Sequence, residues 1–339
     1  MNVLGIETSC DECSAAVVRD GREILSNVVA TQIELHKPYA GVVPELASRL
    51  HTEWIAQVVQ SALQKAELTS ADVDAVAVTN RPGLLGSLLV GLNFAKGYAA
   101  TLDVPFITID HIRAHLFASQ VEKPLEYPYL GLLVSGGHTV ICRVDGYDQI
   151  EVLGTTIDDA IGEAFDKVAK HYDLGYPGGV VIDRLSKNGN PQAFLFPGSA
   201  LNKEGHPYDI SYSGLKTAVI NQLDKFWDGE SEKSPENIAA SFQRTAIGML
   251  MRRVRLALED TGLKRISAGG GVAANSLLRS ELSALEKSGY EVSFPSLKLC
   301  TDNGAMIAAL AYSYLHDGYR SDFSESASAR VSAFKKSYL

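Results

Sequence analysis

Cysteine, long apolar runs and excess positive charge are all scarce in this sequence. Four cysteines in 339 residues are too few for the disulfide framework of a secreted scaffold. The longest nearly apolar stretch, residues 83–95, contains Asn93 and is shorter than the roughly 20 residues that a membrane-spanning helix needs. The first residues show neither the basic region nor the apolar core of a secretory signal. We therefore expect a reduced, cytoplasmic protein with no membrane partner.

Positive charge is outnumbered, since 31 lysines and arginines face 40 acidic residues and the net charge is -9. Proteins that bind nucleic acid on their own usually carry a basic footprint. A nucleic-acid partner would need a local basic patch or a helper protein. The basic clusters at 252–255 and 335–336 are typical of a solvated helix face and a chain end.

The sequence does contain ample material for a core, with 46% hydrophobic residues, and its length favours about two domains. Strand and helix patterns recur in one order in both halves. The first half is expected to hold strands at 3–7, 15–19, 24–29, 73–78 and 105–109. Its helices are expected at 44–65 and from the turn at 80–83 to residue 100. The second half is expected to hold strands at 130–135, 139–144, 150–154, 266–268 and 292–294, with helices at 235–261 and 275–287.

This repetition predicts an α/β protein with one sheet per half, a duplicated two-lobe architecture with a central cleft where ligands bind. The segment 156–213 is interpreted as a helical insertion in the second lobe. The predicted limits are 1–110 plus about 303–325 for the first lobe and 111–302 for the second. Residues 326–339 are expected to form a flexible tail outside both lobes.

Two histidines form the clearest candidate site. His111 and His115 follow the strand at 105–109, and a spacing of four residues places both imidazoles on one helix face, where they can chelate one metal. Asp302 is the best candidate for a third ligand, although its position also suits the N-cap of the next helix. Ile112 stands where a metalloprotease of the two-histidine type carries its general-base glutamate, which argues against that class.

Three glycine-rich turns, at 133–139, 177–179 and 269–275, have the composition of backbone sites for a phosphate. Two of them occupy equivalent points of the repeated lobe, which favours nucleotide binding over plain turns. The polar hairpin turn at 7–12 contains acids that could hold a metal, accept a proton or shape the phosphate site. Zinc or redox chemistry at Cys10 and Cys13 is disfavoured because no second cysteine pair exists.

Several further motifs occur in order along the chain. Together with those above, the set is Glu7-Thr-Ser-Cys-Asp-Glu12, Gly41-Val-Val-Pro-Glu45, Arg49, Pro82-Gly-Leu, His111-x-x-x-His115, Val134-Ser-Gly-Gly-His-Thr139, Gly162-Glu-Ala-Phe-Asp166, Tyr176-Pro-Gly-Gly179, Ser213-Gly-Leu-Lys-Thr217, Gly269 to Asn275 and Cys300-Thr-Asp-Asn303. In this order they resemble the universal family of tRNA N6-adenosine threonylcarbamoyltransferases in its bacterial form. The resemblance covers the chain to about residue 315 and implies the actin-like ATPase fold.

The resemblance implies a metal-dependent acyltransferase. It would move threonylcarbamoyl from threonylcarbamoyl-AMP to the N6 amine of the adenosine 3′ of the anticodon, in tRNAs that read codons starting with A. His111, His115 and Asp302 would hold one iron or zinc ion, and Glu12 and Asp11 would lie at the reaction centre. The residues that would bind the adenylate, or ATP or ADP with magnesium, are Leu133, Val134, Ser135, Gly136, Gly137, Asp166, Gly179, Asp183 and Asn275.

The implied partners are tRNA, a non-catalytic paralogue, a small P-loop ATPase and the synthase that supplies threonylcarbamoyl-AMP. A complex-wide basic surface would then compensate for the acidic charge of this chain. Two alternatives stay open. An ATPase or small-molecule kinase of the same fold would use Asp11 or Asp166 for magnesium and would not need the two histidines. A non-catalytic paralogue would lack the metal ligands and the Ser135–Gly137 turn, and both are present here.

Overall fold

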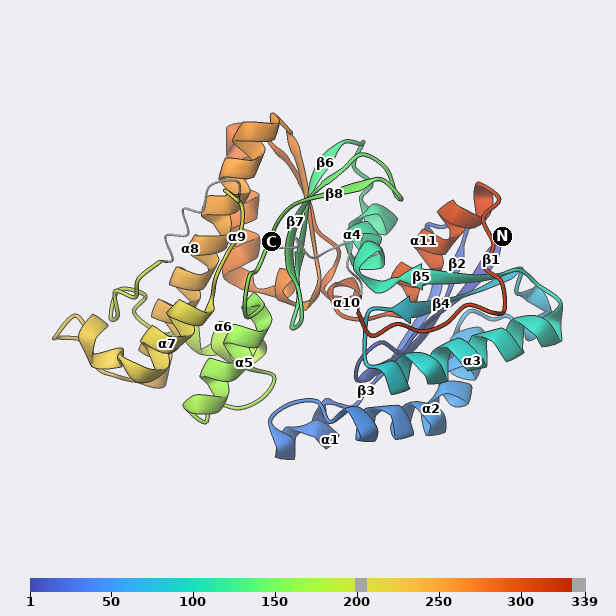
Figure 1. Cartoon of the computed structure of the whole chain (residues 1–339), viewed down its shortest axis with the longest axis horizontal. Helices are drawn as coiled ribbons and strands as arrows, with labels where there is room; N and C mark the ends of the chain where they lie inside the picture. The colour runs from blue at the N-terminus through green and yellow to red at the C-terminus, as the bar shows by residue number, and fades with distance from the viewer. Residues whose placement is uncertain (199–205, 331–339) are drawn as a thin grey trace. The chain divides into compact units, whose positions relative to one another are not determined.

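Two compact units make up the chain in the computed structural model, which describes residues 1–198 and 206–330 (Figure 1). Within the described residues, unit 1 comprises Met1–Pro124 and 295–330, and unit 2 comprises Leu125–Phe294. Each unit contains one five-stranded sheet. No helix in the two described ranges combines the length and the apolar character that crossing a membrane requires.

Unit 1 is a sheet covered by helices on both faces. Its strands are β1 (Asn2–Glu7), β2 (Glu12–Arg19), β3 (Glu23–Thr31), β4 (Ala75–Arg81) and β5 (Phe106–Asp110). Its helices are α1 (Ile33–His36), α2 (Pro44–Lys65), α3 (Leu85–Leu102), α4 (His111–Glu122), α10 (Leu297–Cys300) and α11 (Gly304–His316), with 3-10 turns η1 (Lys37–Tyr39) and η2 (Ser70–Asp72).

The sheet of unit 1 has the order β3-β2-β1-β4-β5. The first three strands are antiparallel, and β1, β4 and β5 run parallel. Asp20 and Gly21, between β2 and β3, both have positive φ, which matches the tight turn that joins twisted antiparallel strands. Because β1, β4 and β5 run parallel, their carboxyl ends lie at one edge of the sheet, and His111 and His115 directly follow the end of β5.

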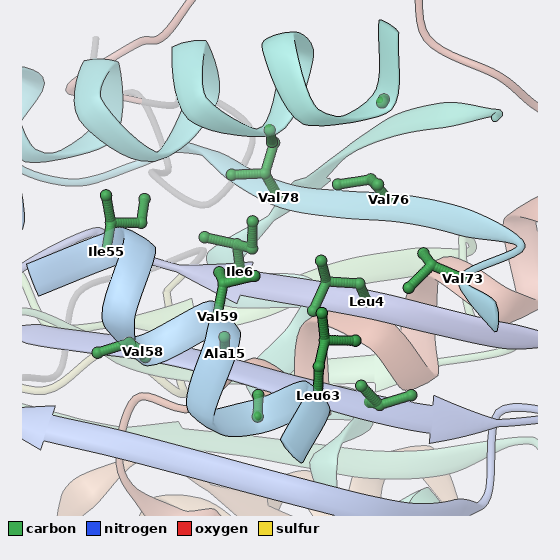
Figure 2. Packing of buried hydrophobic residues seen from close by; sticks show 14 of the residues in the cluster. Leu4, Ile6, Ala15, Ile55, Val58, Val59, Leu63, Val73, Val76 and Val78 are labelled. Atoms are coloured by element: carbon green, nitrogen blue, oxygen red, sulfur yellow. The ribbon is translucent and has the colours of Figure 1, made fainter. Parts of the chain in front are cut away.

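Side chains of β1 alternate between the two faces of the sheet. Leu4 and Ile6 belong to the apolar cluster that α2 fills with Ile55, Val59 and Leu63 (Figure 2). Gly5 faces the other way, where α11 lies so close that a β-carbon on Gly5 would be 2.3 Å from the Gly304 carbonyl oxygen. The missing side chain therefore lets α11 approach the sheet.

Unit 2 repeats the topology of unit 1, with the sheet order β10-β9-β6-β7-β8. The duplication predicted from the sequence is thus confirmed. Its strands are β6 (Tyr129–Val134), β7 (Thr139–Val144), β8 (Ile150–Thr155), β9 (Arg265–Gly269) and β10 (Glu291–Ser293). Its helices are α5 (Ile161–His171), α6 (Gly178–Ser186), α7 (Ser213–Asn221), α8 (Pro235–Thr261) and α9 (Ser276–Ala284), with 3-10 turns η3 (Leu223–Phe226), η4 (Gly271–Ala274) and η5 (Leu285–Ser288).

The limits of the two compact units differ from the predicted lobe limits at both places where the chain passes from one unit to the other, near residues 124 and 295. We assigned 111–302 to the second lobe, but α4 and Asp302 belong to unit 1, because α4 packs against α11. The predicted insertion 156–213 contains α5 and α6 and ends where α7 begins.

The predicted tail at 326–339 is partly ordered against β4. Ser328 donates its backbone N–H to the Asn80 carbonyl oxygen at 2.9 Å, and the Ser326 carbonyl oxygen accepts from the Asn80 side chain. This part of the segment is therefore not a free tail. Residues 331–339 lie outside the described residues.

Candidate functional site

The histidine pair sits on the first turn of α4, directly after β5. The Asp110 carboxylate accepts hydrogen bonds from the backbone N–H groups of Ile112 and Arg113, at 2.9 and 3.2 Å. This cap starts the helix at His111. His111 and His115 then lie on one face, with ring centroids 4.5 Å apart and the rings nearly perpendicular. The geometry agrees with the spacing argument made from the sequence.

Asp302 meets both histidines. Its Oδ1 lies 2.9 Å from His115 Nε2 and 3.7 Å from His111 Nε2. The N-cap alternative for this residue is wrong, because the side chain of Asn303 caps α11 by accepting from the Met306 N–H at 3.1 Å. Asp302 is thereby left to face the imidazoles.

The chemistry of this cluster suits a divalent transition metal. One ligand atom from each of His111, His115 and Asp302 lies within 4.8 Å of the others, and both histidines are buried. Two imidazole nitrogens and one carboxylate are a donor set of zinc enzymes and of non-haem iron enzymes, and they leave further coordination positions open. The three residues can therefore hold an iron or zinc ion.

Glu7, at the end of β1, is one of the acids of the 7–12 segment, for which the sequence left several roles open and did not single out this residue. It is fully buried, and its Oε2 lies 3.0 Å from His111 Nδ1. Burial alone would raise the pKa of Glu7, but His111 brings it below its ordinary value. Burial alone would likewise lower the pKa of His111, whereas the carboxylates of Asp302 and Glu7 raise it to about 9. A metal that binds through His111 must displace a proton.

The loop between β1 and β2 carries the two predicted catalytic acids. Asp11 is buried, and Glu12 is half-buried at the start of β2. Burial raises the pKa of Glu12 well above its ordinary value, and the nearby Asp11 and Asp302 carboxylates raise it further. A carboxyl group with a raised pKa is suited to taking up a proton near neutral pH.

Two carbonyl oxygens of this loop accept hydrogen bonds from residues elsewhere in unit 1. His51 Nε2, on α2, lies 2.8 Å from the Cys10 carbonyl oxygen, and the Gln32 backbone N–H donates to the Asp11 carbonyl oxygen at 3.2 Å. All four cysteines are free. Burial raises the pKa of Cys10 well above its ordinary value and that of Cys13 to about 12, which leaves both thiols protonated and supports the argument against zinc or redox chemistry there.

The predicted phosphate turn, Leu133–Gly137, joins β6 and β7 in unit 2. The Ser135 backbone N–H donates to the His138 carbonyl oxygen at 2.8 Å, and the Ser135 hydroxyl accepts from the His138 N–H at 3.1 Å. Gly136 and Gly137 are exposed, and no atom lies within 4 Å of the place where a β-carbon would stand. Their bare backbone is open to an anion.

The other predicted nucleotide ligands are linked to this turn by short contacts. Gly162, in the first turn of α5, donates to the Ser135 carbonyl oxygen at 3.3 Å. One turn further on, Asp166 accepts from the Gly178 N–H at 2.8 Å, directly before Gly179. The structure therefore gathers the turn, Asp166 and Gly179 in one region of unit 2.

Asp183 and Asn275 each accept hydrogen bonds from the first turn of α9. Asp183 accepts from the backbone N–H and hydroxyl of Ser276, at 3.1 and 2.7 Å. The Asn275 side-chain oxygen caps α9, and its nitrogen donates to the buried Gln243 at 2.8 Å. Gln243 was not foreseen from the sequence, because nothing in the pattern of α8 separates it from other buried positions.

Comparison with known proteins identifies the family. The protein-family model described as "tRNA N6-adenosine threonylcarbamoyltransferase" matches residues 23–309. A relative of that name from Treponema denticola is 62% identical over 336 residues, which is 99% of this chain and 99% of the relative. Another, from Borreliella burgdorferi, is 51% identical over 339 residues, which is 100% of this chain and 96% of the relative.

Solved structures agree on the fold. Full-length HypF, in a phosphate- and nucleotide-bound form, matches 94% of this chain and 47% of its own with a TM-score of 0.63 at 16% identity. Component A of the (R)-2-hydroxyglutaryl-CoA dehydratase of Acidaminococcus fermentans matches 93% of this chain and 99% of its own, with a TM-score of 0.56 at 18% identity. The duplicated units thus have the predicted actin-like ATPase fold, and by its full-length relatives the chain belongs to the tRNA N6-adenosine threonylcarbamoyltransferase family.

Proposed function

We propose that this protein transfers a threonylcarbamoyl group from threonylcarbamoyl-AMP to the N6 amine of the adenosine 3′ of the anticodon, in cytoplasmic tRNAs that read codons starting with A. The convergence of His111, His115 and Asp302 within 4.8 Å, in a chain of this family, carries the proposal. A kinase or a non-catalytic paralogue has no need of this cluster. The acidic net charge of the chain favours tRNA binding together with the non-catalytic paralogue and the small P-loop ATPase.

In this reaction the adenosine amine attacks the carbamoyl carbon, and the bond from that carbon to the phosphate oxygen breaks to release AMP. The buried imidazoles and Asp302 would hold the metal. When bound, iron or zinc supplies Lewis acidity toward the carbamoyl carbonyl. Glu12 takes the proton that the amine loses, which its raised pKa favours.

The unit 2 residues bind the leaving adenylate. The exposed N–H groups of Gly136 and Gly137 contact its phosphate, where negative charge develops as the bond breaks. Asp166, Asp183 and Asn275 orient the nucleoside, with Gly179 leaving room for it. ATP or ADP with magnesium would occupy the same residues, because the recognised groups are shared.

The test is mass spectrometry of tRNA nucleosides from cells depleted of this protein and rescued with variants. Threonylcarbamoyladenosine should fall on depletion, return with the wild type and stay absent with Asp302→Ala. Glu259→Ala is the control, because Glu259 is an exposed carboxylate on α8. This variant should rescue fully. An unchanged nucleoside level on depletion would contradict the proposed reaction, and full rescue by Asp302→Ala would contradict the role of the metal site.

Metal analysis of the purified protein tests the cofactor separately. The wild type should hold about one iron or zinc ion per chain, since three ligands suffice for one site. His111→Ala should retain much less metal after purification, because only two of the three ligands remain. Equal metal content in the two proteins would refute the assignment of the ligands.

A further inference from the structure

We infer that Glu7 is the positioning residue of the metal site, because its carboxylate fixes the tautomer of His111 so that Nε2 is the free nitrogen on the side of Asp302. This inference rests on the metal site of the proposed function and not on the transfer reaction. It concerns a buried acid that is not one of the three ligands.

The Glu7 carboxylate acts as the acceptor in its hydrogen bonds. Its Oε1 accepts from the Ser9 backbone N–H at 2.5 Å, and its Oε2 accepts from the Thr79 hydroxyl at 2.5 Å. An ionised carboxylate has only acceptors. The third contact, to His111 Nδ1 at 3.0 Å, therefore requires a proton on Nδ1.

The consequence appears at the other ring nitrogen. With Nδ1 protonated, a neutral imidazole presents the lone pair of Nε2, and in His111 this atom lies 3.7 Å from Asp302 Oδ1. A metal-ligating histidine typically donates its second N–H to a carboxylate or carbonyl, which orients the ring and raises the basicity of the ligating atom. Glu7 and His111 have that arrangement.

The second histidine lacks such a partner among residues 1–198 and 206–330. Nδ1 of His115 is buried and makes no hydrogen bond there, while its Nε2 contacts Asp302. The two ligands are therefore unequal, since only His111 has a carboxylate at the ring nitrogen that lies away from Asp302. The Ser9 hydroxyl, 3.2 Å from His111 Nδ1, lies on the same side and adds to this anchor.

Glutamine at position 7 tests the geometry with almost no change of volume. If its amide oxygen keeps the Ser9 N–H, its NH₂ group points at His111 Nδ1 and forces the proton to Nε2, the ligating atom. If the amide is reversed, its NH₂ group meets the Ser9 N–H, and two donors face each other. Neither orientation reproduces the wild-type bonds.

The experiment measures Zn²⁺ affinity of the full chain by competition with a chromophoric chelator at pH 7.5. Glu7→Gln should bind Zn²⁺ about 10- to 100-fold more weakly, the loss typical when the outer partner of a metal ligand is removed. Ile6→Val, a buried change on the same strand that faces α2, should leave the affinity within about threefold. Proton NMR of the zinc-loaded wild type should show a downfield imidazole N–H at His111 that Glu7→Gln lacks.

A double-mutant cycle separates this role from general destabilisation. In a His111→Ala background, Glu7→Gln should lower Zn²⁺ affinity no further, whereas in a His115→Ala background it should retain its effect. A purely structural Glu7 would act equally in both backgrounds, and that result would overturn the inference.

Other outcomes are equally decisive. An unchanged Zn²⁺ affinity in Glu7→Gln would refute the positioning role while leaving the metal site intact. Absence of Zn²⁺ and Fe²⁺ binding by the wild type would refute the metal site and the inference with it. Should Glu7→Gln fail to fold, Glu7→Asp withdraws the carboxylate by one methylene, and wild-type affinity in that variant would refute the inference.

Discussion

Adding one methyl group at Gly304 should both destabilise unit 1 and weaken metal binding. Gly304 begins α11, two residues after Asp302. A β-carbon there would lie 2.6 Å from the Ala16 nitrogen, 2.7 Å from the Gly5 oxygen and 2.8 Å from the Ala15 carbonyl carbon. All three atoms are backbone atoms of paired strands, so they cannot rotate away as a flexible side chain would.

The magnitude follows from two opposing effects. Forcing an extra methyl group into a well-packed region costs about 1–3 kcal/mol, and contacts with backbone on three sides place Gly304→Ala near the upper limit. Alanine also favours a helix over glycine by up to about 1 kcal/mol. We expect a net loss of about 2 kcal/mol, together with weaker Zn²⁺ binding because α11 and Asp302 must shift.

Urea unfolding followed by Trp54 fluorescence reads unit 1, provided that the second tryptophan, Trp227 in unit 2, is replaced by phenylalanine in every variant. Gly97→Ala is the matched control, because Gly97 is an exposed glycine inside α3 with no atom within 4 Å of a β-carbon. That variant should gain about 0.5–1 kcal/mol. If Gly304→Ala were as stable as the wild type and bound Zn²⁺ equally well, the packing argument would fail.

Two further predictions concern the titration of the site and the nucleotide ligands. The metal-free protein should lose stability as the pH rises from 6.5 to about 9, because the raised pKa of His111 gives a contribution that is complete below 6.5 and lost above 9. This contribution to the free energy of unfolding is at most about 3 kcal/mol. If the urea midpoint varied with pH as much in His111→Gln as in the wild type, the contribution would not come from His111. Gln243→Leu should weaken AMP binding about fivefold in calorimetric titrations, since Asn275 loses a hydrogen bond of about 1 kcal/mol; unaltered affinity would mean that Asn275 needs no such support.

Much of the fold follows from local sequence signals. The bounds of α2 and α8 were predicted in full, because each helix starts with a proline at its first position and α8 is followed by Gly262, whose positive φ ends it. The start of β2 at Glu12 was missed, because polar residues there hide a strand that pairs with β3. The unit limits were missed because only the packing of α4 on α11 assigns that helix.

The site likewise contains residues that a local sequence pattern predicts and residues whose roles depend on contacts between distant parts of the chain. The histidine pair is a local pattern, and a four-residue spacing sufficed to predict it. Asp302 and Asn303 are adjacent residues of equal capping ability, so the sequence could not say which one caps α11. The particular role of Glu7 among the acids of 7–12 could not be predicted, because it depends on His111, which is distant in the chain and reaches it only in the folded unit.

The two crossings of the chain between units have a consequence for synthesis on the ribosome. Unit 2 is continuous from Leu125 to Phe294, whereas unit 1 needs both the first 124 residues and the segment that begins at Pro295. Until α11 has been made, the face of the β1–β2 strands that it covers stays open, and the two histidines lack Asp302. Unit 2 can therefore complete its folding before unit 1, and a product truncated before Asp302 has no complete metal site.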